Sequence, residues 1–190
     1  MATIERDIVL VPTGYASSEA ASFIAQLDDQ SERLRRDLEG VTAAELEWQQ
    51  ALGMNTIGML LVHNAIVEVL WSQVGVRGEA VDTMSVLGLD YHAGDGMPLP
   101  PDAPPPASLA GKPLAYYLDL LERARAYAKQ TAVHVTDADL ETLRSRTRRD
   151  GTQQEFNVRW VLYHMLEHFA GHYGQILLLR HMYRAQHAKV

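Results

Sequence analysis

Four long segments of this 190-residue chain carry apolar side chains at intervals of three and four residues. This spacing gathers the apolar side chains on one face of an α-helix, and that face can pack against neighbouring helices. The pattern therefore predicts an all-α fold, a four-helix bundle that forms a single domain over residues 1–190. We expect the helices over residues 17–39, 55–74, 112–133 and 155–187.

Polar residues mark the beginnings of helical segments. Ser17 or Ser18 can cap the first long helix and Asn55 the second, because these side chains accept hydrogen bonds from free amide groups. Thr42 and Thr136 each start a short helical turn between the long helices. Ahead of the first helix, we expect residues 1–14 to be extended.

The connection between the second and third helices is long and rich in proline. Residues 77–111 hold six of the eight prolines of the chain. Proline lacks an amide proton and disfavours helix in the residue before it, so we expect an irregular crossover loop here. A loop of this length is unusual inside a compact domain. It is either an ordered surface crossover or a functional lid.

Charge and hydropathy restrict the partners of the chain. The formal net charge of −7 argues against nucleic acid, which binds basic surfaces. The one basic run, Arg144–Arg149, is expected in a solvated polar loop over residues 144–153. The first residues do not resemble a signal peptide, and no apolar run approaches the roughly 18 residues of a spanning helix. We therefore expect a cytoplasmic protein with no membrane partner.

Three histidines stand four residues apart in the last helix: His164, His168 and His172. Because the chain has no cysteine, a transition-metal site must use histidine, aspartate or glutamate. Histidines four apart lie on one helix face and can share one ion, whereas His164 and His172 are about 12 Å apart along the axis. One adjacent pair can therefore bind a metal, and the third histidine has another role.

The pair formed by His168 and His172 fits a metal site best, because both lie on the apolar seam of the helix. Gly171 and Gly174 beside them suggest close helix packing or a ligand channel, since glycine inside a helix costs about 1 kcal/mol. A third ligand should come from a facing helix. His63 occupies a seam position in the second helix and completes a three-histidine set typical of catalytic metal sites.

The remaining candidates have weaker spacing. We expect His164 to support the site by packing or to act as a catalytic proton carrier, and Tyr163 is the alternative proton carrier. Glu68 and Glu167 are expected to be solvated or hydrogen-bonded rather than metal ligands. The other histidines have no spacing partner and are expected at the surface: His92, His134, His181 and His187.

Two segments resemble the DinB/YfiT-like superfamily of metalloenzymes. The segment Met54–His63 is similar to the family's second helix, which carries its first ligand histidine. The segment Glu167–Gln175 is similar to the fourth-helix motif, in which two histidines four apart precede Gly-Gln. The flanking residues Val158–His164 and Leu177–Arg180 also match.

This resemblance implies an up-down-down-up bundle in which His63, His168 and His172 hold one divalent metal ion, nickel or zinc, with water completing the shell. Mycothiol-dependent maleylpyruvate isomerases have glutamate at the position of His168. The histidine of this chain is closer to the bacillithiol-transferase-like members.

The resemblance also implies a function, namely a metal-dependent S-transferase or isomerase that joins a low-molecular-weight thiol to an electrophilic substrate. Two alternatives stay open. One is a metal-dependent hydrolase that would use Glu68 or Glu167 as base, and the other is a non-enzymatic, stress-associated metal-binding dimer. We expect a homodimer, paired through the first and third helices.

Overall fold

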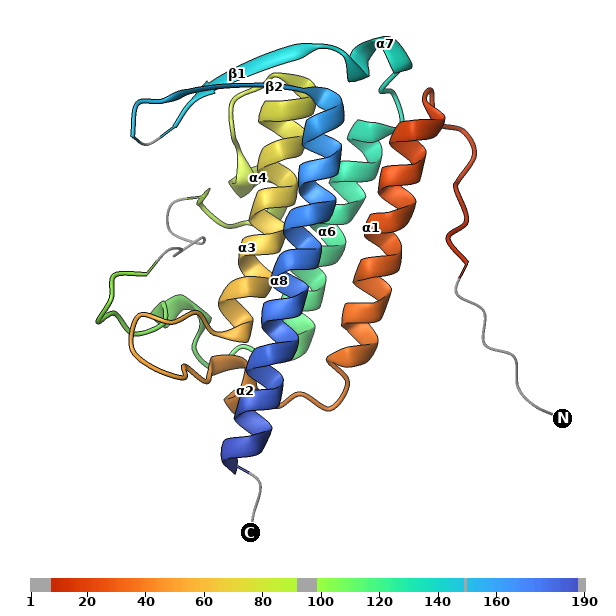
Figure 1. The fold of residues 1–190 in the computed structure, drawn as a ribbon. Helices are drawn as coiled ribbons and strands as arrows, with labels where there is room; N and C mark the ends of the chain where they lie inside the picture. Colours follow the sequence, from red (N-terminus) through yellow and green to blue (C-terminus); the bar gives the residue numbers. More distant parts are fainter. Residues whose placement is uncertain (1–7, 92–98, 149, 188–190) are drawn as a thin grey trace, which may run out of the picture.

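The computed structural model describes residues 8–91, 99–148 and 150–187. Its described part is built around four long helices, α1 (Ser18–Asp37), α3 (Ile57–Leu70), α6 (Leu114–Ala132) and α8 (Val158–His187). Figure 1 shows that α1 and α8 run in one direction and α3 and α6 in the other. The predicted helical bundle is confirmed, and its long crossover connects the two parallel helices α3 and α6.

The helix caps agree with the sequence at three positions and differ at one. The side chains of Ser17, Thr42 and Thr136 accept amide hydrogen bonds at the starts of α1, α2 (Ala43–Glu47) and α7 (Asp137–Leu140). The predicted cap at Asn55 is wrong. Instead, the Thr56 hydroxyl accepts from the Met59 amide at 3.2 Å. The extended backbone of Thr56, with φ −95° and ψ 166°, allows its side chain to reach that amide.

The predicted polar loop over residues 144–153 is wrong in part, because the structure has a β-hairpin there. Strand β1 (Leu143–Thr147) pairs antiparallel with β2 (Gln153–Asn157), and α8 starts only after β2, at Val158. Exposed and partly buried side chains alternate along β1, and the partly buried ones are polar. Polar strands of this kind carry no apolar alternation that sequence reasoning could detect.

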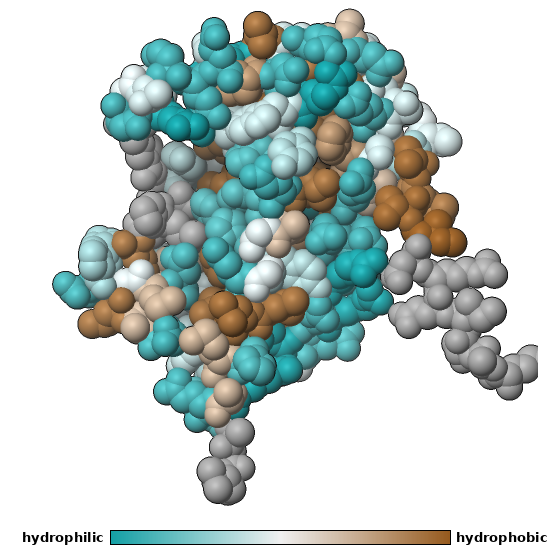
Figure 2. Space-filling view, viewed as in Figure 1, coloured by the Kyte–Doolittle hydropathy of each residue, from teal (hydrophilic) through white to brown (hydrophobic). Residues whose placement is uncertain are grey.

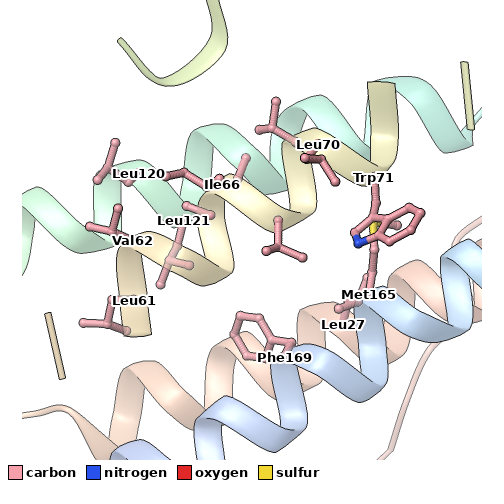
Figure 3. Close-up of a cluster of buried hydrophobic side chains, with 14 of the residues drawn as sticks. Leu27, Leu61, Val62, Ile66, Leu70, Trp71, Leu120, Leu121, Met165 and Phe169 are labelled. Atoms are coloured by element: carbon pink, nitrogen blue, oxygen red, sulfur yellow. The ribbon is translucent and has the colours of Figure 1, made fainter. Parts of the chain in front are cut away.

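Helix α3 is the centre of the core, and nearly all of its residues are buried. Figure 3 shows side chains of α3 facing Leu120 and Leu121 of α6 on one side and Phe169 of α8 on the other. The helix continues as a π-helix, η1 (Trp71–Arg77), which Gly78 ends in a left-handed conformation. Contrary to the sequence-based expectation, the segment Ile57–Arg77 is long and apolar enough to cross a membrane, but 83% of its apolar window is buried inside the bundle. Core helices pass the same test, so this finding is weak evidence for a span.

Two buried ion pairs connect the helices across the core. Arg125 of α6 donates to both carboxylate oxygens of Glu68 on α3, at 2.5 and 3.1 Å, and also contacts Asp28 of α1. Arg180 near the end of α8 donates to Glu45 of α2 at 2.7 Å, and both side chains are almost fully buried. A buried charge without its partner is strongly destabilising, so these pairs fix how the helices align.

The described part of the crossover includes α4 (Thr83–Leu87) and a 3-10 turn, η2 (Ala107–Leu109). Residues 92–98, and with them the predicted surface residue His92, lie outside the described residues. The second half of the crossover is anchored to the turn before α3. The Gly53 amide donates to the Ala103 carbonyl at 2.9 Å, and the Gln49 side chain donates to the same oxygen at 3.1 Å.

Gly53 is required at this anchor for two reasons. Its φ of +80° disfavours other residues, and a Cβ there would overlap the backbone of Pro101. We expect Gly53→Ala to lower the free energy of unfolding by about 2–4 kcal/mol, measured by urea denaturation.

Gly40→Ala is the matched control, because Gly40 has a φ of +71° but nothing within 4 Å of its added Cβ. Equal losses in the two variants would show that backbone strain alone accounts for the effect, and that the Pro101 contact contributes nothing.

Candidate metal centre

Three histidines from two helices converge between α3 and α8. His63 extends from α3, and His168 and His172 extend from adjacent turns of α8. One ring nitrogen of each lies within 4.8 Å of the others. The Nε2 atom of His168 lies 3.0 Å from Nε2 of His63 and 3.2 Å from Nε2 of His172. The structure thus brings together the three residues that the sequence singled out.

These spacings fit a shared metal ion. Imidazole nitrogens bind divalent zinc at about 2.0–2.1 Å, so two ligands at angles of 90–110° are about 2.9–3.4 Å apart. Both Nε2 distances from His168 lie in this range. The ring planes are inclined to one another by 48–86°, with centroids 4.4–4.9 Å apart. Each ring can therefore aim its nitrogen at one common point.

The protonation of His168 also fits a metal ligand. Its pKa is lowered from 6.5 to about 3, chiefly because burial disfavours the charged imidazolium, and the neighbouring histidines add to the effect. The ring is therefore neutral at physiological pH. Its Nε2 atom faces two other Nε2 atoms, and a single N–H can donate to only one of them. A cation at the common point would satisfy all three lone pairs.

Gln175 fixes the orientation of His172. The Nδ1 atom of His172 lies 2.7 Å from Oε1 of Gln175, one turn further along α8. Because an amide oxygen accepts, Nδ1 carries the proton and donates it, which leaves the lone pair on Nε2. Partners of this kind hold a histidine in the tautomer that a metal requires.

His164 lies beside this cluster but does not belong to it. Its ring stacks on Trp160 at 4.6 Å and 7°, and its centroid is 5.8 Å from that of His168. Burial lowers the pKa of His164 from 6.5. The charge of Glu167 opposes this shift and that of Arg146 adds to it. A neutral, half-buried imidazole next to the three ligands can accept a proton.

The two carboxylates considered as bases or ligands have other partners. Glu68 is buried and held by Arg125, while Glu167 is exposed and accepts a hydrogen bond from Tyr163, which raises the pKa of that phenol. The expectation that both are hydrogen-bonding residues agrees with these contacts. Among the described histidines outside the cluster, three are exposed as expected: His134, His181 and His187.

The interpretation of the two glycines as sites of close helix packing is wrong. A Cβ added to Gly171 or Gly174 would have nothing within 4 Å, and both residues are exposed on α8. They face away from the bundle, so no neighbouring helix requires glycine there.

Sequence reasoning missed the aromatic residues that border His164. Trp71, Phe156 and Trp160 have ring centroids 5.1–5.6 Å apart, and Trp71 also contacts His164 at 5.2 Å. These residues come from η1, β2 and α8. The four-residue spacing of Trp160 and His164 was the only signal in the sequence, and the hairpin that supplies Phe156 was not expected.

Comparison with protein-family models matches residues 22–185 to the family described as Mycothiol-S-transferase. The matched range includes all three histidines of the cluster and most of the bundle. A search of curated proteins finds no match.

We expect the protein, purified without a histidine tag, to hold about one divalent ion per chain, and His63→Ala or His172→Ala to remove it. Gln175→Ala should weaken metal affinity about 10–100-fold, because it removes only the partner that orients His172. Elemental analysis and competition with a chelating dye would measure both effects. His134→Ala, at an exposed position, is the control. Full metal occupancy in His63→Ala would contradict the assignment.

Proposed function

Because this chain belongs to the mycothiol-S-transferase family, part of the DinB/YfiT-like superfamily, we propose that it joins the sulfur of mycothiol to an electrophilic small molecule. The reaction would take place at a divalent metal ion held by His63, His168 and His172. The observation that carries this proposal is the convergence of one ring nitrogen from each of the three histidines, with Nε2 of His168 close to Nε2 of both others.

The donor set suits thiol chemistry. A divalent ion held by three neutral imidazoles would keep its charge and would lower the pKa of a thiol bound to it. His168 supports this role because its lowered pKa keeps it uncharged. Gln175 supports it by holding the proton of His172 on Nδ1, away from the cluster.

The reacting sulfur has to come from the substrate, because the chain contains no cysteine. In the proposed reaction the S–H bond of mycothiol breaks and its proton passes to a base. The sulfur electron pair then forms a bond to the electrophilic carbon. In a substitution, a leaving group departs with its bonding electrons. In an addition to a double bond, the π electrons move to the neighbouring carbon, and that carbon receives a proton.

We assign the proton-accepting role to His164. Its ring lies one helical turn from His168 and is held by Trp160 and Trp71, so its position is fixed relative to the cluster. Because its pKa is lowered from 6.5, the ring is neutral and able to accept a proton at pH 7.

The structure favours this reaction over metal-assisted hydrolysis. A hydrolase of the kind considered from the sequence would use Glu68 or Glu167 as general base. Glu68 accepts hydrogen bonds from Nε and Nη2 of Arg125, which hold it in the core away from the cluster. Glu167 is exposed and hydrogen-bonded to Tyr163.

We expect the metal-loaded protein to conjugate mycothiol to a model electrophile such as a haloalkyl bimane. Chromatography of the conjugate measures the rate. His63→Ala should reduce the metal-dependent rate to background, and His134→Ala should leave it unchanged. Bacillithiol and glutathione in place of mycothiol test the choice of thiol. A metal-loaded protein that accelerates none of these reactions would refute the proposal.

His164→Gln tests the proton acceptor separately. We expect kcat to fall about 10²–10⁴-fold, the usual contribution of a general base, with metal content unchanged. In the unaltered protein, kcat should fall as the pH drops through the pKa of His164, below 6.5, because the protonated ring cannot accept a proton. The variant should lose this acid limb. An unchanged pH profile in His164→Gln would exclude His164 as the base.

A further inference from the structure

The β-hairpin directs one cationic side chain toward the aromatic residues near the metal centre. Arg146 lies in β1, opposite Gln154 of β2, and its side chain is partly buried. Its guanidinium carbon stands 4.3 Å from the ring centroid of Trp71, within cation–π distance. The Nε atom donates to the Gln154 side chain at 2.9 Å. Two contacts therefore fix the guanidinium in place.

No carboxylate among the described residues balances this charge. Arg146 forms no ion pair within 4.0 Å there, whereas Arg125, Arg159 and Arg180 each hold one or two acidic side chains. Burial lowers the pKa of Arg146, the charge of Arg148 lowers it further, and the phenol of Tyr91 has a smaller, opposite effect. A fixed, partly desolvated guanidinium without an acid is a favourable place for an anion.

A chain of ring contacts connects Arg146 to the metal centre. Trp71, under the guanidinium, lies 5.2 Å from His164, and His164 lies 5.8 Å from His168. The charge of Arg146 contributes to the lowered pKa of His164, which agrees with this proximity. Arg146 thus stands on the side of the centre that carries the proposed proton acceptor.

We propose that Arg146, supported by Trp71 and Gln154, forms an anion-binding subsite that takes a carboxylate of the electrophilic co-substrate. The guanidinium nitrogens other than Nε can bind both oxygens of a carboxylate in parallel. The indole of Trp71 holds the guanidinium in position. The identity of the carboxylate as part of the electrophile rests on the proposed function, but the anion site itself does not.

The binding experiment uses the metal-free protein and a pair of probes that differ in charge, fumarate and its neutral diamide. The three tryptophans provide the readout through their indole N–H signals in two-dimensional NMR. Trp71 and Trp160 lie at the subsite, while Trp48 contacts Tyr183 and His187 near the other end of α8 and serves as the internal reference. We expect fumarate to shift the signals of Trp71 and Trp160 and to leave Trp48 unchanged.

Arg146→Gln should weaken fumarate binding at least tenfold, and Arg146→Lys should retain part of it, because lysine keeps the charge but not the planar fork. Arg148→Gln is the matched control. Arg148 is in the same arginine-rich segment, also donates to Gln154 and is exposed. Fumarate binding of unchanged strength in Arg146→Gln, or equal binding of the diamide, would overturn the subsite. If Arg146→Gln fails to fold, two other measurements test the subsite: binding of fumarate against its diamide in the unaltered protein, and fumarate binding to Arg146→Lys.

A second arm separates this inference from the proposed function. In the conjugation assay, Arg146→Gln should raise KM for an unsaturated acid about tenfold and leave KM for its amide unchanged. Fumarate binding together with no conjugation would refute the transferase and retain the anion site. Conjugation with equal KM for acid and amide in the unaltered protein would retain the transferase and refute the subsite.

Discussion

The register between α3 and α8 is the constraint on which the metal centre depends. His63 can meet His168 only if the two helices keep one relative position along their axes. Apolar contacts alone allow some sliding, but the buried pair of Arg180 with Glu45 holds the far end of α8 against the segment that precedes α3. At the near end, Arg159 donates to Glu19 at 2.6 Å and so attaches α8 to the start of α1. Slippage would break charged contacts, one of them buried, and would be strongly unfavourable.

Two buried polar side chains, Glu68 and Asn64, lie on α3 near the metal centre. Burying a polar group costs free energy unless it is hydrogen-bonded, and only Glu68 is. Glu68 is satisfied by Arg125, one turn of α3 beyond the site. Asn64, next to His63, is 2% exposed and has no partner for either of its amide atoms among the described residues. It borders a small void lined also by His168 and Phe169, which has no space for a water molecule. An apolar residue would be more stable there, so Asn64 is an unexplained destabilising feature beside the site.

Features that follow from the spacing of apolar residues could be predicted from the sequence, whereas features that depend on contacts between polar side chains could not. The bundle and the three histidines follow from apolar spacing and from the similarity of two helical segments to a known superfamily. The hairpin does not, because the inward side of β1 carries the partly buried Arg146, which contacts Trp71 and Gln154, and no apolar side chain. Asn55 is the predicted cap of α3 and Thr56 is the observed one; both are cap-forming residue types, and the backbone conformation distinguishes Thr56. The expected homodimer and the cellular location stay predictions.

The π-helix η1, which continues α3, lies between the apolar core and the residues of the proposed site. At η1 the backbone approaches α8 so closely that a Cβ on Gly75 would lie 2.7 Å from both methyl groups of Val161 and 3.0 Å from the ring of Trp71. This approach places the Trp71 ring between α8 and the hairpin, in contact with His164 on one side and Arg146 on the other. π-Helical segments within α-helices are often found at functional sites. Here the wider turn sets the position of a ring that contacts both the proposed base, His164, and the guanidinium of Arg146. Trp71, which is only 2% exposed, therefore positions the groups of the proposed site without supplying a reacting group itself.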